Sequence, residues 1–178
     1  MIQKLKYCYG ITSETDDRLN HVFMMDFDGV GLQTVKEYLN RIQVDNNLSD
    51  IYIIESTNGY NAISLDKLPQ SLIYNWGNYA YSPADRQFLK IGFERGYFVL
   101  RFGHDKKLVE TLINASNVYE KSLAHKKFLE WFFDIKIVCA PLDTNKEITL
   151  IRFPSKKHGY HTVQKDIIKV GHNVSAKI

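Results

Sequence analysis

The sequence has little of what cross-links small proteins or spans a membrane. It has only two cysteines, which lie far apart and in no metal-ligand spacing, so we expect reduced thiols without a disulfide framework. No apolar run approaches the roughly 20 residues that a membrane-spanning helix needs. The N-terminal residues lack the apolar core of a secretory signal. A cytoplasmic protein with no membrane partner is therefore expected.

Charge of neither sign dominates the chain, whose formal net charge is only +3. Its distribution is uneven, because residues 143–178 carry seven lysines and arginines against three acids. This basic tail favours contact with a nucleic acid, and a solvated basic face gives the same pattern. The residues predicted to make that contact are Arg152, Lys156, Lys157 and His158.

The hydrophobic content of 44% is enough for one folded domain over residues 1–178. Alternating and β-rich runs predict four strands, over 21–28, 51–55, 60–65 and 97–102. Helical spacing of apolar residues predicts three helices, over 32–42, 69–76 and 82–95. The order βαββαβ is that of RRM-like and ferredoxin-like palm folds, so we expect an α+β protein with a palm-like core over 20–105.

The remaining residues, 106–178, are expected to form a helical and basic C-terminal extension. Apolar residues at helical spacing cover 108–133. Two β-rich runs, 135–138 and 147–153, lie on either side of a turn at Pro141. C-terminal helices and a small β annex are therefore expected to complete the domain.

The first predicted strand ends in an Asp-x-Asp pair, Asp26 and Asp28. Side chains alternate along a strand, so both carboxylates share a face with Val22 and Met24, and the face with the phenylalanines is expected to meet the helices. On an open face the pair could hold a divalent cation, whereas two aspartates can also simply cap a turn.

The expected strand order adds polar neighbours to this pair. In a split βαβ sheet the first strand lies between the third and the fourth, which carry Asn61 and Arg101. A cation beside the acids suits a triphosphate or a nucleic-acid backbone. An ion pair between Arg101 and an aspartate of the neighbouring strand is the alternative.

Three segments resemble the motifs of archaeo-eukaryotic primases, the superfamily that includes plasmid and viral primase-polymerases. Residues 22–29, VFMMDFDG, resemble its hydrophobic-Asp-hydrophobic-Asp motif. Residues 54–63, IESTNGYNAI, resemble its second motif, with Asn61 where the family has a histidine that helps hold the nucleotide phosphates. Asp85 and residues 96–101 resemble the third acidic position and the Leu-Arg strand after it. The resemblance covers about residues 20–105.

The resemblance implies a template-directed nucleotidyltransferase of the DNA primase and polymerase type. Asp26, Asp28 and Asp85 would hold Mg²⁺ or Mn²⁺, and Glu94 and Asp105 are alternatives for the third acid. The implied partners are a single-stranded DNA or RNA template, nucleoside triphosphates and a separate helicase. The residues implied to contact the nucleotide are Ser56, Asn61, Arg101 and Lys106.

Two other interpretations of the same sequence stay open. In the first, the fold is a catalytically inactive nucleic-acid-binding accessory module for replication, and Asn61 marks the loss of catalysis. In the second, the chain is a ferredoxin-like protein-interaction domain, and the Asp pair is incidental.

Overall fold

The computed structural model describes residues 8–15, 19–103, 105–139, 142, 147–153 and 164–169. Within these ranges the strands are β1 (Cys8–Thr12), β2 (Asn20–Asp28), β3 (Ile51–Ser56), β4 (Gly59–Pro69), β5 (Val99–Phe102), β6 (Lys107–Leu112), β7 (Glu147–Phe153) and β8 (Gln164–Lys169). The helices are α1 (Leu32–Asn46), α2 (Gln70–Gly77), α3 (Arg86–Arg95) and α4 (Leu123–Phe133).

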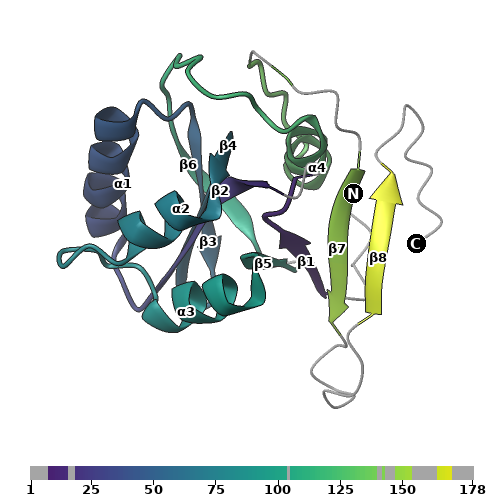
Figure 1. Cartoon of the computed structure of the whole chain (residues 1–178), viewed down its shortest axis with the longest axis horizontal. Helices are drawn as coiled ribbons and strands as arrows, with labels where there is room; N and C mark the ends of the chain where they lie inside the picture. Colours follow the sequence, from purple (N-terminus) through teal and green to yellow (C-terminus); the bar gives the residue numbers. More distant parts are fainter. Residues whose placement is uncertain are drawn as a thin grey trace.

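The structure confirms the expected α+β class, with helices and antiparallel strands mixed along the chain (Figure 1). From β2 to β5 the elements follow the predicted βαββαβ order, with the two helices α2 and α3 in the second helical position. The strands form two sheets, ordered β2-β4-β3-β6 and β5-β1-β7-β8. None of the helices in the described ranges is both long enough and apolar enough to cross a bilayer.

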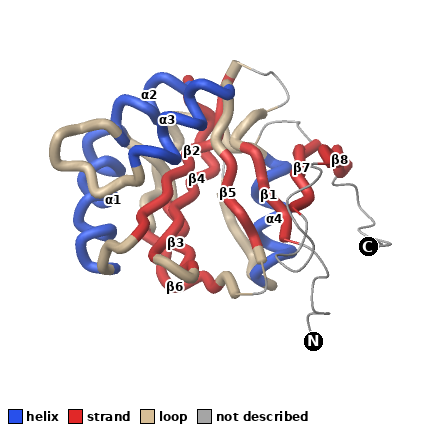
Figure 2. The backbone as a smooth tube through the Cα atoms, turned by 90° about the horizontal axis from the view of Figure 1, so that it is seen from below, coloured by secondary structure: helices blue, strands red, loops and turns tan. Residues whose placement is uncertain are grey.

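Three helices, α1, α2 and α3, lie together on one side of the β2-β4-β3-β6 sheet (Figure 2). Aromatic contacts fix this packing: the ring centroids of Phe23 and Trp76 are 6.2 Å apart, and those of Phe27 and Tyr38 are 6.1 Å apart. Such offset and edge-on contacts add to the free energy gained by burying the rings. The phenylalanine face of β2 therefore meets the helices, as the alternation predicts.

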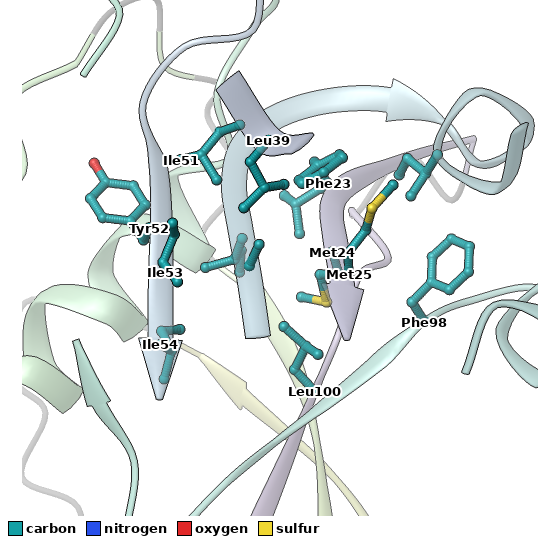
Figure 3. Packing of buried hydrophobic residues seen from close by; sticks show 14 of the residues in the cluster. Phe23, Met24, Met25, Leu39, Ile51, Tyr52, Ile53, Ile54, Phe98 and Leu100 are labelled. Atoms are coloured by element: carbon teal, nitrogen blue, oxygen red, sulfur yellow. The ribbon is translucent and has the colours of Figure 1, made fainter. Parts of the chain in front are cut away.

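The opposite face of β2 is closed over most of its length, which corrects the expectation of an open face. Val22 and Met24 are fully buried, although they alternate with the phenylalanines. Figure 3 shows Met24 among the buried hydrophobic side chains of the core, and β5 contacts β2. Only the end of the strand is accessible, where Asp26 is partly buried and Asp28 is exposed.

The strand pairing of β5 also differs from the expectation. β5 pairs with β1, with Arg101 opposite Gly10, and not with β2. The reason is an additional N-terminal strand, β1, which the sequence reasoning left out and which occupies the edge of β5. The segment after β1 joins the two sheets, because Ser13 receives a backbone hydrogen bond from Val22 and donates one to Phe98.

The C-terminal predictions are only partly correct. The predicted long helix over 108–133 is wrong, because residues 107–112 form β6 and only residues 123–133 are helical. In β6 the exposed side chains of Lys107 and Val109 alternate with more buried ones, which suits the edge of a sheet. Residues 135–138 are not a strand, whereas 147–153 form β7, which pairs with β1 and with the unexpected strand β8.

A buried ion pair attaches the segment between β6 and α4 to the sheet. Lys121 and Asp66 are both almost fully buried, and their charged groups are 3.4 Å apart. Lys121 Nζ also donates to the carbonyl oxygens of Ser116 and Tyr119, and Asp66 accepts from Ser49 and Ser64. These bonds matter because a buried charge without partners is very costly. They hold residues 116–121 beside the sheet.

His125 joins α4 to β1 inside the protein. Its Nε2 lies 2.8 Å from the carbonyl oxygen of Thr12, which can only accept, so Nε2 carries the proton. Its Nδ1 then accepts from the hydroxyl of Ser122, the N-cap of α4, at 2.6 Å. Burial lowers the pKa of His125 from 6.5 to about 4, because the imidazolium would lose its hydration.

We expect acid to destabilise the fold through His125. The pKa is depressed in the folded state, so the stabilisation by the neutral ring is complete above about pH 6.5 and is lost as the pH falls toward 4. A shift of this size corresponds to about 3 kcal/mol of unfolding free energy. Urea unfolding of wild type and His125→Gln between pH 7 and pH 4 measures it. Parallel stability curves for the two proteins would contradict the assignment.

Candidate metal centre

Three carboxylates meet at the accessible end of β2. One oxygen each of Asp26, Asp28 and Asp85 lies within 4.8 Å of the others, and among the described residues this is the group of acids, histidines and cysteines that could hold a metal ion. Asp28 is exposed, while Asp26 and Asp85 are partly buried. We call these three residues the acidic triad. The structure thus brings together the three acids that the sequence suggested as ligands.

Two glycines shape the end of β2 and bring the next hairpin close to it. Gly29 follows Asp28 with a φ of +68°, a conformation that glycine adopts without strain, and its amide donates to the carbonyl of Asn58 at 2.8 Å. Gly59 lies opposite Asp28 in the sheet. A Cβ atom at Gly59 would be 1.9 Å from the carbonyl oxygen of Phe27, so only glycine allows this approach.

Asp85 reaches the triad from a different element, because it is the N-cap of α3. Its Oδ1 accepts hydrogen bonds from the amides of Gln87 at 2.6 Å and Phe88 at 3.1 Å. Its own amide donates to the carbonyl oxygen of Asp26 at 2.8 Å, which attaches the start of α3 to β2. Capping uses one carboxylate oxygen. The second oxygen is not needed for the cap.

The electrostatics of the triad centre on Asp26, whose pKa is raised from 3.8 to about 6. Burial is the largest cause, since it disfavours the charged carboxylate, and the nearby charges of Asp28 and Asp85 add to it. The ammonium group of Lys106 acts in the opposite direction and lowers the pKa. A divalent cation at this place would relieve the same repulsion.

Asn61 connects Asp26 to Lys106. It is the cross-strand neighbour of Asp26 on β4, it is only 5% exposed, and its side-chain amide donates to Oδ1 of Asp26. Lys106 Nζ donates to Oδ1 of Asn61 at 2.6 Å. Asn61 therefore holds the carboxylate of Asp26 in place, and Lys106 supplies a positive charge nearby.

The other predicted nucleotide-binding residues lie farther from the triad. Ser56 is opposite Gly59, which is opposite Asp28, so Ser56 shares the face of Asp28 but is two strands away, at about 10 Å. Arg101 is exposed on β5, and the strand alignment that would place it beside the aspartates does not occur, because β5 pairs with β1.

The remaining candidates are the alternative third acids and the residues predicted to contact nucleic acid. The structure describes some of them and not others. Glu94 lies in the last turn of α3, and Asp105 accepts a hydrogen bond from Thr57 at 2.7 Å, so neither belongs to the triad. Arg152 lies on β7, opposite Tyr9 of β1. Three of the residues predicted to contact nucleic acid lie outside the described ranges: Lys156, Lys157 and His158.

The donor chemistry of the triad fits a hard divalent cation. Three carboxylates supply the oxygen ligands that Mg²⁺, Mn²⁺ and Ca²⁺ prefer, and no thiol or imidazole joins them in the group. The exposure of Asp28 leaves room for water or a substrate oxygen to complete the coordination. The triad can therefore hold a metal ion.

Sequence reasoning missed the loop that leads into the triad, residues 78–85 between α2 and α3. This loop carries two exposed tyrosines, Tyr79 and Tyr81, and ends at Asp85. The only local signal was the pair of aromatic residues around Ala80 between two helices, which is not specific to any function.

We expect Asn61→Ala to weaken metal binding without removing a ligand. The carboxylate of Asp26 would lose the amide that orients it, and such supporting contacts are typically worth about 10- to 100-fold in metal affinity. Titration calorimetry with Mn²⁺ measures the effect, and Thr57→Ala, a truncation in the adjacent hairpin, is the matched control. Equal Mn²⁺ affinities for wild type and Asn61→Ala would contradict this role.

Two substitutions of Asp85 should separate its two roles. Asn caps helices as well as Asp, so Asp85→Asn should keep the thermal stability of the wild type but bind Mn²⁺ more weakly. Asp85→Ala should also lose about 1 kcal/mol of stability, because α3 loses its cap. Thermal unfolding and Mn²⁺ titration of both variants test this. Unchanged Mn²⁺ binding in Asp85→Asn would remove Asp85 from the triad's function.

Comparison with known proteins identified no relative of the chain. Neither the family models, nor the curated proteins, nor the solved structures give a significant match to the chain. The function must therefore be argued from the chemistry of the site itself.

Proposed function

We propose that the protein is a metal-dependent nucleotidyltransferase that extends a nucleic-acid chain on a single-stranded template. The observation that carries the proposal is the acidic triad. Two of its aspartates, separated by one residue, lie at the end of a strand, and the third lies at the N-terminus of a helix. Phosphoryl transfer with two divalent cations requires such a set of carboxylates at an accessible place. The resemblance to primase-polymerase motifs points to the same chemistry.

The triad would hold Mg²⁺ or Mn²⁺ through Asp26, Asp28 and Asp85. Divalent cations, when bound, would make a 3′-hydroxyl more acidic and neutralise the leaving pyrophosphate. Asp85 is restrained by the cap of α3, and Asp26 by Asn61, so these two carboxylates are already oriented in the protein without metal. Preorganised ligands of this kind lower the cost of assembling the reacting groups.

Lys106 is the best placed cation for the phosphates of an incoming nucleoside triphosphate. Its ammonium group lies close enough to Asp26 to lower the pKa of that carboxyl, and an amide of Asn61 separates the two. An ammonium at this distance can contact a phosphate that is bound to the same cations as the triad. Ser56, on the same face and about 10 Å away, would contact the sugar or base end of the nucleotide.

Access to the site also favours a polymeric substrate. Residues 21–25 of β2 are buried, whereas Asp28 and the hairpin residues Thr57 and Asn58 are exposed. The acids thus lie at the surface of a rigid sheet rather than inside a closed pocket. A nucleic-acid strand can reach such a site without opening the fold.

Nucleotide incorporation tests the proposal. With Mn²⁺, labelled nucleotides and a single-stranded template, wild type should make product that EDTA abolishes. Asp26→Ala and Asp28→Ala should each lower the rate of incorporation by more than about 100-fold, because each removes a carboxylate that would bind the cation directly. Glu94→Gln, which removes one negative charge from α3 outside the triad, is the matched control and should keep the wild-type rate.

The same assay separates the proposal from the accessory-module interpretation. Binding of the template without any product, and without sensitivity to Asp26→Ala or Asp28→Ala, would favour a non-catalytic nucleic-acid-binding module. Salt should weaken that binding, because contacts to phosphates release counterions. A protein that neither binds a template nor makes product would contradict both interpretations.

A further inference from the structure

The loop between α2 and α3, residues 78–85, presents two aromatic rings to solvent and ends at Asp85 of the triad. Tyr79 is 39% exposed and Tyr81 is 54% exposed, so neither ring is part of the core. Their ring centroids are 5.7 Å apart and their planes are tilted by 41°. Neighbouring exposed rings offer a contiguous aromatic surface to a ligand.

The backbone of this loop is held by several hydrogen bonds. The guanidinium of Arg86 donates to the carbonyl oxygens of Gly77 and Tyr79, both at 2.9 Å, and to the side chain of Asn78 at 3.0 Å. The hydroxyl of buried Tyr38 donates to the carbonyl oxygen of Trp76 at 2.6 Å. The two exposed rings are thus attached to a rigid support, which reduces the entropy lost when a ligand binds.

A positive charge accompanies the rings. The guanidinium carbon of Arg41, an exposed residue of α1, lies 5.0 Å from the ring centroid of Tyr81. Tyr81 also makes an edge contact with Tyr38, whose centroid is 6.2 Å away. A tyrosine pair with a guanidinium over one of its rings combines the two groups that bind a single strand: rings that stack on bases and a cation for the phosphate.

The loop leads directly into the triad. Only three residues separate Tyr81 from Asp85, so their Cα atoms are at most about 14 Å apart. At 3.4 Å for each stacked nucleotide, about four nucleotides would span this maximum distance. The amide of Asp85 is bonded to Asp26, so the rings have a fixed position relative to the carboxylates.

We propose that Tyr79, Tyr81 and Arg41 form a stacking platform for single-stranded nucleic acid. This inference rests on the proposed function, for which the platform would be the template-binding surface. Unpaired bases stack on the exposed rings, and the guanidinium of Arg41 contacts a neighbouring phosphate. A duplex is excluded from this mode, because its bases are already stacked and paired. Stacking of this kind does not depend on the base sequence.

Binding of a labelled oligothymidylate in EDTA tests the platform apart from the metal chemistry. By fluorescence anisotropy, Tyr79→Ala and Tyr81→Ala should each bind about tenfold more weakly than wild type. Tyr81→Phe keeps the ring and should bind within about twofold of wild type. Trp131→Ala, which removes an exposed ring from α4, is the control and should bind like wild type.

The salt dependence of the same binding separates the roles of the rings and of the cation. Arg41→Gln should lower the slope of log affinity against log salt by about 0.7, the value for one phosphate contact on a single strand. Tyr79→Ala and Tyr81→Ala should leave that slope unchanged. Thermal unfolding of each variant should match wild type, which shows that the loop is folded in all of them.

The outcomes also separate the platform from the proposed transferase activity. Tyrosine-dependent binding without any incorporation in Mn²⁺ would support the platform and refute the transferase. Incorporation that depends on Asp28 but is unaffected by the double substitution Tyr79→Ala, Tyr81→Ala would refute the platform alone. Wild-type oligonucleotide affinity in that double variant, or equal tyrosine dependence for a duplex, would also overturn it.

Discussion

The hydrogen bond from the amide of Asp85 to the carbonyl oxygen of Asp26 joins the two parts on which the site depends. One part is a sheet strand that carries two carboxylates, and the other is a helix start that carries the third. Three like charges within 4.8 Å repel one another, so the fold must hold them together. It does so through this backbone bond, the helix cap at Asp85 and the amide of Asn61.

The same arrangement explains why the site lies at the edge of a well-packed protein. β2 is buried on both faces from His21 to Met25, and the strand then ends at Asp28, just before Gly29. The loop before Asp85 is fixed at one end by Arg86 and at the other by β2. The acidic triad and the two exposed tyrosines therefore lie on one support.

Local sequence patterns were sufficient for β2, α1, β3, β4 and the Asp pair, because each of these depends on alternation or helical spacing within a short segment. They could not give the pairing of β5 with β1, since that contact joins residues some 90 positions apart. Residues 107–112 were misassigned because their apolar spacing suits either a helix or an edge strand. The triad was suggested only through the resemblance, since nothing local connects Asp85 to β2.

Cation binding by the three carboxylates can be seen by anomalous diffraction at the manganese edge, from crystals grown with Mn²⁺ and a non-hydrolysable nucleoside triphosphate. We expect anomalous density within ligand distance, about 2.0–2.6 Å, of oxygens from Asp26, Asp28 and Asp85. Manganese bound elsewhere, with these three carboxylates unliganded, would contradict it.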